Sequence, residues 1–272
     1  MQSLTITLIQ ANLFWEDKAA NLRMLEDKII NRQEPTEMVI LPEMFTTGFS
    51  MNPTVFAETM EGETVAWMKR IAMEEKIILT GSVIIKEEDK YFNRLIWMLP
   101  NGSYGVYDKR HLFGFAKEDE YYNAGSKRLI AQVKGWKINL QVCYDLRFPV
   151  WARQQQTSSQ PTVKEDEKEP EFDILIYVAN WPERRSHPWK TLLCARAIEN
   201  QCYVIGVNRV GDDGNKIYHS GNSMVIDPLG QVLYHKADEE DMFTITLEKE
   251  NLNEVRTKFP FLKDADRFII NN

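Results

Sequence analysis

The sequence predicts a single α/β domain, spanning 1–272, in which mixed β-sheets are covered by helices. A chain of 272 residues with 43% hydrophobic content, seven Trp and thirteen Phe can fill one large core. Strand-like and helical patterns alternate in the first hundred residues, as they do in α/β proteins. Runs of strands dominate the rest of the chain, which favours mixed sheets over a purely parallel one.

The individual elements follow from hydrophobic periodicity. Short apolar or alternating runs predict strands, and longer runs with apolar residues three and four apart predict helices. The predicted strands are 4–10, 38–42, 77–85, 92–99, 129–133, 136–142, 172–179, 202–209, 221–227 and 242–248. The predicted helices are about 16–33, 62–75, 186–200 and 248–256.

One segment breaks this pattern. Residues 154–171, QQQTSSQPTVKEDEKEPE, contain almost no apolar side chains. Such a stretch buries too little apolar surface to offset the entropy lost on ordering. Because the apolar run that follows it fits the same sheet as 136–142, we interpret 154–171 as a polar surface insertion within one domain.

Composition excludes several classes of function. The net charge of −7 comes without a basic stripe, so nucleic acid and anionic membranes are not expected as partners. Three cysteines without ligand spacing predict neither a disulfide framework nor a zinc site, and they suit a reducing compartment. The first ten residues lack a signal peptide's basic region, and no apolar run could cross a bilayer. We expect a soluble, cytoplasmic protein.

Two charged residues follow strand-like runs. Glu43 comes directly after the run ending at Pro42 and is either a solvated loop acid or a general base in an apolar setting. Lys109 is either a surface cation paired with Asp108 or a cation that holds an oxyanion and lowers the pKa of a nearby thiol.

Cys143 is the candidate nucleophile. It ends the apolar run 136–142 and precedes a turn, a position that can aim a thiol, although a free Cys is commonly a small core residue. Cys194 and Cys202 fit the core interpretation. A Cys-His dyad is the alternative, and sequence spacing selects no partner among the four histidines, which are His111, His187, His219 and His235.

Three segments in order carry a family resemblance. They are 41–43 (LPE), 108–113 (DKRHLF) and 142–149 (VCYDLRFP). They resemble the signature motifs of the nitrilase or carbon-nitrogen hydrolase superfamily. Three further segments resemble the bacterial omega-amidase branch, whose substrates are 2-oxoglutaramate and 2-oxosuccinamate: 179–182 (ANWP), 195–201 (ARAIENQ) and 221–230 (GNSMVIDPLG).

The resemblance implies a four-layer α-β-β-α sandwich that dimerises through helices, and a triad of Glu43, Lys109 and Cys143. A second active-site glutamate falls on Glu118, with Asp119 and Glu120 beside it as neighbouring possibilities. The implied chemistry is attack by the thiol to form a thioester, with no metal or organic cofactor. Lys109 and the backbone N–H of Tyr144 would form the oxyanion hole.

A 2-oxo acid substrate would need a planar cation for its carboxylate, which makes Arg185 and Arg147 candidates. Arg147 could instead pair with Asp145 or another core acid. Trp181 and Phe115 are the first choices for the walls of a small pocket, ahead of Phe45, Phe49 and Phe113. Three functions remain open at this stage: omega-amidase, hydrolase of another linear amide, N-carbamoyl compound or nitrile, and a catalytically silent binding protein.

Overall fold

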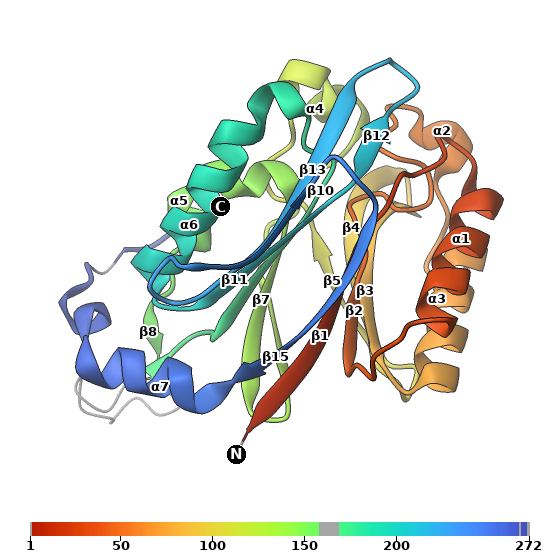
Figure 1. Cartoon of the computed structure of the whole chain (residues 1–272). Helices are drawn as coiled ribbons and strands as arrows, with labels where there is room; N and C mark the ends of the chain where they lie inside the picture. The colour runs from red at the N-terminus through yellow and green to blue at the C-terminus, as the bar shows by residue number, and fades with distance from the viewer. Residues whose placement is uncertain (1, 158–168, 267, 271–272) are drawn as a thin grey trace.

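The computed structural model describes residues 2–157, 169–266 and 268–270, and it contains two large β-sheets packed face to face (Figure 1). The first sheet has six strands in the order β15-β1-β2-β3-β4-β5. Its strands are β1 (Ser3–Gln10), β2 (Met38–Ile40), β3 (Ile78–Glu87), β4 (Lys90–Met98), β5 (Tyr104–Asp108) and β15 (Asp241–Glu248). Strands β1, β2 and β3 are parallel, whereas β4, β5 and β15 join antiparallel at the edges.

The second sheet has the order β12-β13-β11-β10-β7-β6, with β14 paired to β13. Its strands are β6 (Leu129–Val133), β7 (Trp136–Val142), β10 (Ile174–Ala179), β11 (Tyr203–Asn208), β12 (Val210–Asp212), β13 (Tyr218–Ile226) and β14 (Val232–Ala237). Strand β10 pairs in parallel with β7 and β11, and the remaining pairs are antiparallel. Both sheets are therefore mixed, as the sequence predicts.

Helices cover the outer faces of both sheets. Helices α1 and α3 lie against the first sheet, and α5 and α6 lie on the far side of the second (Figure 1). The α-helices are α1 (Lys18–Ile30), α2 (Pro53–Phe56), α3 (Glu63–Glu75), α4 (Glu118–Tyr121), α5 (Pro149–Ala152), α6 (Ser186–Asn200) and α7 (Lys249–Lys258). Short 3₁₀ turns are η1 (Gly114–Ala116), η2 (Cys143–Arg147), η4 (Glu183–Arg185) and η5 (Phe261–Asp264). The predicted α-β-β-α layering is confirmed.

The core explains the layering. Apolar side chains that alternate along β1 point to opposite faces, so Ile6 and Leu8 join the cluster shared with the second sheet and Ile9 joins the cluster under α1 and α3. The second sheet contributes Ile138 and Leu140 to the shared cluster. Within the described residues, no helix combines the length and apolar content that a membrane span needs.

The described ends of the predicted polar insertion are anchored. Strand β8 (Gln156–Thr157) pairs antiparallel with β9 (Glu169–Pro170). Gln154 is buried, and its backbone N–H donates to Asn200 at 2.8 Å. The sequence predicts a surface position for Gln154, but its polar groups bond to Asn200 on α6 and to the Phe172 backbone N–H, which allows it to be buried. Residues 158–168 of the insertion lie outside the described part of the chain.

Candidate active site

Strand ends from both sheets meet at the upper end of the sandwich in Figure 1. Glu43 follows β2 and Lys109 follows β5 in the first sheet, whereas Cys143 follows β7 and Asn180 follows β10 in the second. Carboxyl ends of parallel strands are common positions for functional groups, because the loops there start from a rigid edge. Glu118, the first residue of α4, completes the group.

Lys109 lies between two carboxylates. Its Nζ is 2.9 Å from Oε1 of Glu43, and 3.0 and 2.8 Å from the two carboxylate oxygens of Glu118. All three side chains are completely buried. Lys109 therefore does not form the surface pair with Asp108 that the sequence also allowed. Asp108 instead binds Arg94, with 2.6 Å between its Oδ1 and the Arg94 Nε.

Backbone and amide donors complete the carboxylate shells. The Asn180 backbone N–H donates to Oε2 of Glu43 at 2.8 Å, and its side-chain amide donates to the Glu43 carbonyl at 2.7 Å. The backbone N–H of Phe113 donates to Oε2 of Glu118 at 2.6 Å. Each carboxylate is thus fixed by groups on rigid backbone, which is a requirement for a preorganised site.

The electrostatic balance at Cys143 favours the protonated thiol. Burial raises the pKa of Cys143 well above its usual value, and the negative charge of Glu43 raises it further, while Lys109 lowers it. Burial alone would lower the pKa of Lys109, but Glu118 and Glu43 together raise it. Lys109 thus lowers the pKa of Cys143, as the sequence analysis expected, but burial and Glu43 outweigh its effect. The positive charge of Lys109 is paired with the carboxylates of Glu43 and Glu118.

The same competition acts on Glu118. Burial raises its pKa, the Lys109 ammonium opposes that shift, and Glu43 adds to it. With both carboxylates and the ammonium charged and the thiol neutral, the cluster carries a net charge of −1. A thiolate would bring a second uncompensated negative charge into a buried site, so the thiol needs a base as it reacts.

Local backbone strain aims two of these groups. Met44, next to Glu43, has φ 42°, and Cys143 itself has φ 47°, values that non-glycine residues rarely adopt. Asp145 holds the turn at Cys143: it accepts from the Val142 backbone N–H at 3.0 Å and from the Tyr107 hydroxyl at 2.7 Å. Such conformations persist only where the surroundings determine them, and they concentrate at functional sites.

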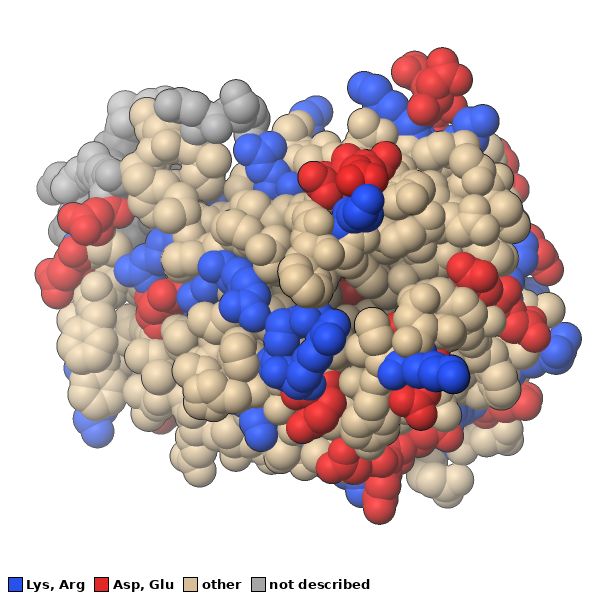
Figure 2. Space-filling model, turned by 90° about the horizontal axis from the view of Figure 1, so that it is seen from above, with Lys and Arg blue, Asp and Glu red and all other residues tan. Residues whose placement is uncertain are grey.

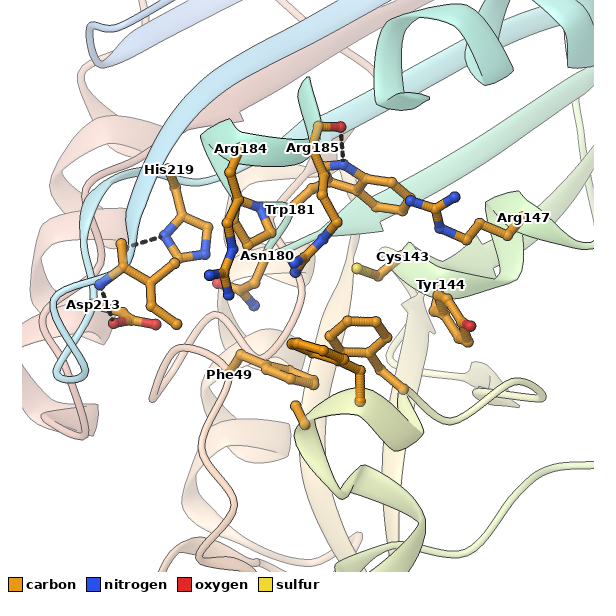
Figure 3. Close-up of a pocket in the computed structure, with 15 residues that line it drawn as sticks. Phe49, Cys143, Tyr144, Arg147, Asn180, Trp181, Arg184, Arg185, Asp213 and His219 are labelled. Carbon is orange, nitrogen blue, oxygen red and sulfur yellow. Dashed lines mark hydrogen bonds between the residues drawn. The ribbon is translucent and has the colours of Figure 1, made fainter. Parts of the chain in front are cut away.

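A cavity of about 260 Å³ opens onto Cys143 (Figure 3). Aromatic side chains form much of its wall, and Cys143 lies with Tyr144 on one side of it. The lining residues are Phe49, Phe113, Phe115, Ala116, Cys143, Tyr144, Arg147, Asn180, Trp181, Pro182, Arg184, Arg185, Asp213, Ile217 and His219. The mixture of apolar walls and a few charged groups is typical of a small-molecule site.

Three arginines give this cavity its charge. Arg185 lies 5.0 Å above the centre of the Phe113 ring, and Arg147 lies 5.1 Å above that of Trp181. Neither they nor Arg184 forms an ion pair within the described ranges. Burial lowers the pKa of Arg185, and the nearby Arg184 charge adds to this. Figure 2, which views the molecule from above relative to Figure 1, shows Lys and Arg side chains gathered near the middle, next to a hollow.

The structure brings together the residues that the sequence analysis placed first for the site. Phe115, Trp181, Arg185 and Arg147 all line the cavity with Cys143. Two secondary expectations are wrong. Phe45 belongs to the core cluster under α1 and α3, and Asp145 binds Tyr107 and His111 in place of Arg147, which stacks on Trp181.

The histidines do not supply a base for the thiol. The Nδ1 atom of His111 is 2.8 Å from Asp145, and its ring stacks on Phe148. His235 bonds to Asn222 at 2.7 Å, and His187 is exposed. His219 lines the cavity, but burial lowers its pKa to about 4. Glu43 is the nearby acid whose negative charge raises the pKa of the Cys143 thiol.

The sequence analysis missed several groups of the site, and it named His219 only as a possible base. Asn93 on β4 contacts both carboxylates, and Arg184, Asp213, Ile217 and His219 form the far wall of the cavity. Only Asn93 had a local signal, because it is a lone amide within the apolar strand YFNRLIWM. The others lie on loops whose positions depend on how the two sheets meet.

Comparisons with known proteins agree with this geometry. The model of the family described as carbon-nitrogen hydrolase matches residues 5–257. The chain is 41% identical to omega-amidase YafV of Yersinia enterocolitica over 99% of this chain and 100% of that protein. It is 30% identical to 2-oxoglutaramate amidase of Bacillus subtilis over 96% of each. A CN-hydrolase superfamily protein of Xanthomonas campestris, solved with an arsenic adduct in its active site, matches with TM-score 0.94 and 44% identity, covering 100% of both chains.

Proposed function

The chain belongs to the carbon-nitrogen hydrolase family, and from this premise we propose that it is an omega-amidase. Its substrate would be the terminal carboxamide of a small 2-oxo acid, such as 2-oxoglutaramate or 2-oxosuccinamate, and its products the corresponding acid and ammonia. Omega-amidase YafV and 2-oxoglutaramate amidase, which match over nearly their full lengths, support this assignment.

The observation that carries the proposal is the set of arginines beside the thiol. A protein with a net charge of −7 repels anions overall, yet Arg147, Arg184 and Arg185 line the cavity that contains Cys143. An arginine presents planar, paired donors that match a carboxylate. A bound carboxylate would also relieve the repulsion among the three guanidinium groups. A small amide with a carboxylate at its other end would place its amide group at Cys143 and its carboxylate at the arginines.

The first half-reaction transfers the acyl group to sulfur. As the Cys143 thiol attacks the amide carbon, its proton passes to Glu43, and the new C–S bond leaves a negative oxygen on the former carbonyl. Lys109 and the backbone N–H of Tyr144 stabilise that oxygen. Tyr144 is in the first turn of η2, where backbone N–H groups have no partner inside the helix. Collapse breaks the C–N bond, and Glu43 returns its proton to the departing ammonia.

The second half-reaction releases the acid. Glu43 takes a proton from a water molecule that attacks the thioester carbon, and the same two donors stabilise the second oxyanion. The C–S bond then breaks, and the proton on Glu43 restores the Cys143 thiol. Glu43 thus acts alternately as base and acid, which fits a carboxylate that is held by Asn180 and Lys109 and whose charge acts on the thiol.

A substrate panel tests the proposed function. Ammonia release should be fastest with 2-oxoglutaramate or 2-oxosuccinamate, compared with a nitrile, an N-carbamoyl amine and a simple aliphatic amide of the same length. A preference for the nitrile or the carbamoyl compound would move the assignment to another reaction of the family. If none of these compounds released ammonia, the proposal that the protein is an enzyme of this type would be contradicted.

The arginines make a separate prediction about binding. Arg185→Met or Arg147→Met should raise KM for 2-oxoglutaramate about 10- to 100-fold, because a charge-assisted hydrogen bond contributes about 1.5–3 kcal/mol. Steady-state kinetics with the neutral amide of the same length provide the matched control, which should change far less. The arginine whose loss removes the preference for the anionic substrate is the carboxylate ligand. Equal losses with both substrates would contradict a carboxylate-binding role.

The expected homodimer and cytoplasmic location remain predictions. Light scattering on the purified protein would give the molecular mass in solution, and a mass of about 32 kDa would contradict the homodimer, since one chain is 31.8 kDa.

A further inference from the structure

Asn93 is a buried amide that contacts both carboxylates of the site. It lies on β4, and its Nδ2 is 2.8 Å from Oε1 of Glu43 and 3.3 Å from Oε1 of Glu118. Lys109 Nζ bonds to the same two oxygen atoms, at 2.9 and 3.0 Å. The two carboxylates therefore share two donor groups, one charged and one neutral. Asn93 does not line the cavity, so it would act through the carboxylates and not on the substrate.

The orientation of this amide is fixed by its neighbours. Turning it over would place the amide oxygen against the two carboxylate oxygens, where both sides would be acceptors. In the orientation that donates, Oδ1 of Asn93 has no hydrogen-bond partner in the described part of the chain. A buried acceptor without a partner is costly, so the two donated bonds have to outweigh that cost. Asn93 is also tied to Lys109 through its carbonyl, which accepts the Lys109 backbone N–H at 3.0 Å.

Charge counting shows what this amide contributes. Two buried carboxylates and one ammonium leave an excess of one negative charge, which Lys109 alone does not offset. The titratable groups that feel the charges of these carboxylates are Lys109, the Cys143 thiol and the hydroxyl of Tyr122, whose pKa is raised by burial and by Glu118. None of these adds a positive charge beyond Lys109. A neutral donor stabilises the negative form without altering the charge that the thiol experiences.

We propose that Asn93 is a positioning residue that keeps Glu43 and Glu118 in their negative forms around Lys109, so that Glu43 can accept the thiol proton at the pH at which the enzyme works. This inference rests on the proposed roles of Glu43 and Cys143. Asn93 would then help to set the pH below which the enzyme loses activity.

The test replaces Asn93 with leucine, which has a similar shape and no donor. The acid limb of the pH profile of kcat/KM should move to higher pH by about half a unit to one unit, because carboxylates that lose a donor take up a proton more readily. At a pH on the acid limb the value of kcat/KM should therefore fall about 3- to 10-fold, mainly through kcat. Asn93→Asp adds a third acid and should move the limb further in the same direction.

Asn139 offers a matched control. It is equally buried, lies on β7, and its amide has no hydrogen-bond partner among the described residues. Asn139→Leu should therefore leave the acid limb unchanged. Asn93→Ser, which is smaller and keeps one donor, serves if the leucine variant does not fold, and should give a smaller shift in the same direction.

A second readout separates this inference from the substrate assignment. The rate of Cys143 alkylation by iodoacetamide, followed by intact mass across pH, needs no amide substrate. Its acid limb should also move to higher pH in Asn93→Leu. A folded Asn93→Leu or Asn93→Ser protein with the unchanged profile in both assays would overturn the role of Asn93, whatever amide the enzyme prefers.

Discussion

Cys143→Ala should lower amide hydrolysis to the rate measured without enzyme. Loss of a nucleophile in this type of mechanism lowers kcat by about 10⁶, because the remaining groups have no covalent intermediate to stabilise. The fold should persist, since the substitution removes one sulfur atom at the edge of a cavity and no bond that holds η2. Ammonia release from 2-oxoglutaramate and the midpoint of thermal unfolding measure the two effects.

Cys202→Ala is the matched control for this variant. Cys202 is also a buried thiol, and burial raises its pKa as well, but it does not line the cavity. Its loss should cost stability and leave turnover intact. Acid-quenched protein should also carry an acyl group on Cys143 during turnover, visible by intact mass. Turnover of the Cys143→Ala protein above a few per cent of the parent rate would rule out the thioester route.

The fold is predicted well from local patterns where turns are well marked. The strands 129–133 and 136–142 and the helix 186–200 end where the structure ends them. Lys134 and Gly135 both have positive φ, which a two-residue hairpin turn requires, and Gln201 closes α6 in the left-handed conformation. Strands β5, β12 and β14 were missed, because they are short or polar and depend on pairing with a neighbouring strand.

The functional site was also predicted only in part from the sequence. The motifs and their order identify Glu43, Lys109 and Cys143, and Glu43 and Cys143 also follow predicted strands. The protonation state of Cys143 could not be predicted from sequence. It depends on the burial of the thiol and on the contacts of Lys109 with two acids, whose combined charge its single positive charge does not offset. The Asn93 contacts have the same origin, since they require β4 and the loop after β2 to meet in three dimensions.

Lys109→Gln should lower activity strongly and also destabilise the protein. The oxyanion loses a donor that contributes about 3–4 kcal/mol to the transition state, which corresponds to a 10²- to 10³-fold loss in kcat. The free energy of unfolding should fall by about 3–5 kcal/mol, because Glu43 and Glu118 remain buried without their cation. Urea denaturation and steady-state kinetics measure the two quantities. Lys117→Gln, which breaks an exposed pair with Glu120, should change stability by less than about 1 kcal/mol.

The double variant Lys109→Gln/Glu118→Gln separates the two effects. It restores the net charge of the cluster from −2 to the original −1, so much of the lost stability should return. Activity should not return, because neither substitution replaces the ammonium that faces the oxyanion. If activity recovered together with stability, Lys109 would serve only to neutralise its two acids, and the backbone N–H of Tyr144 would have to stabilise the oxyanion without it.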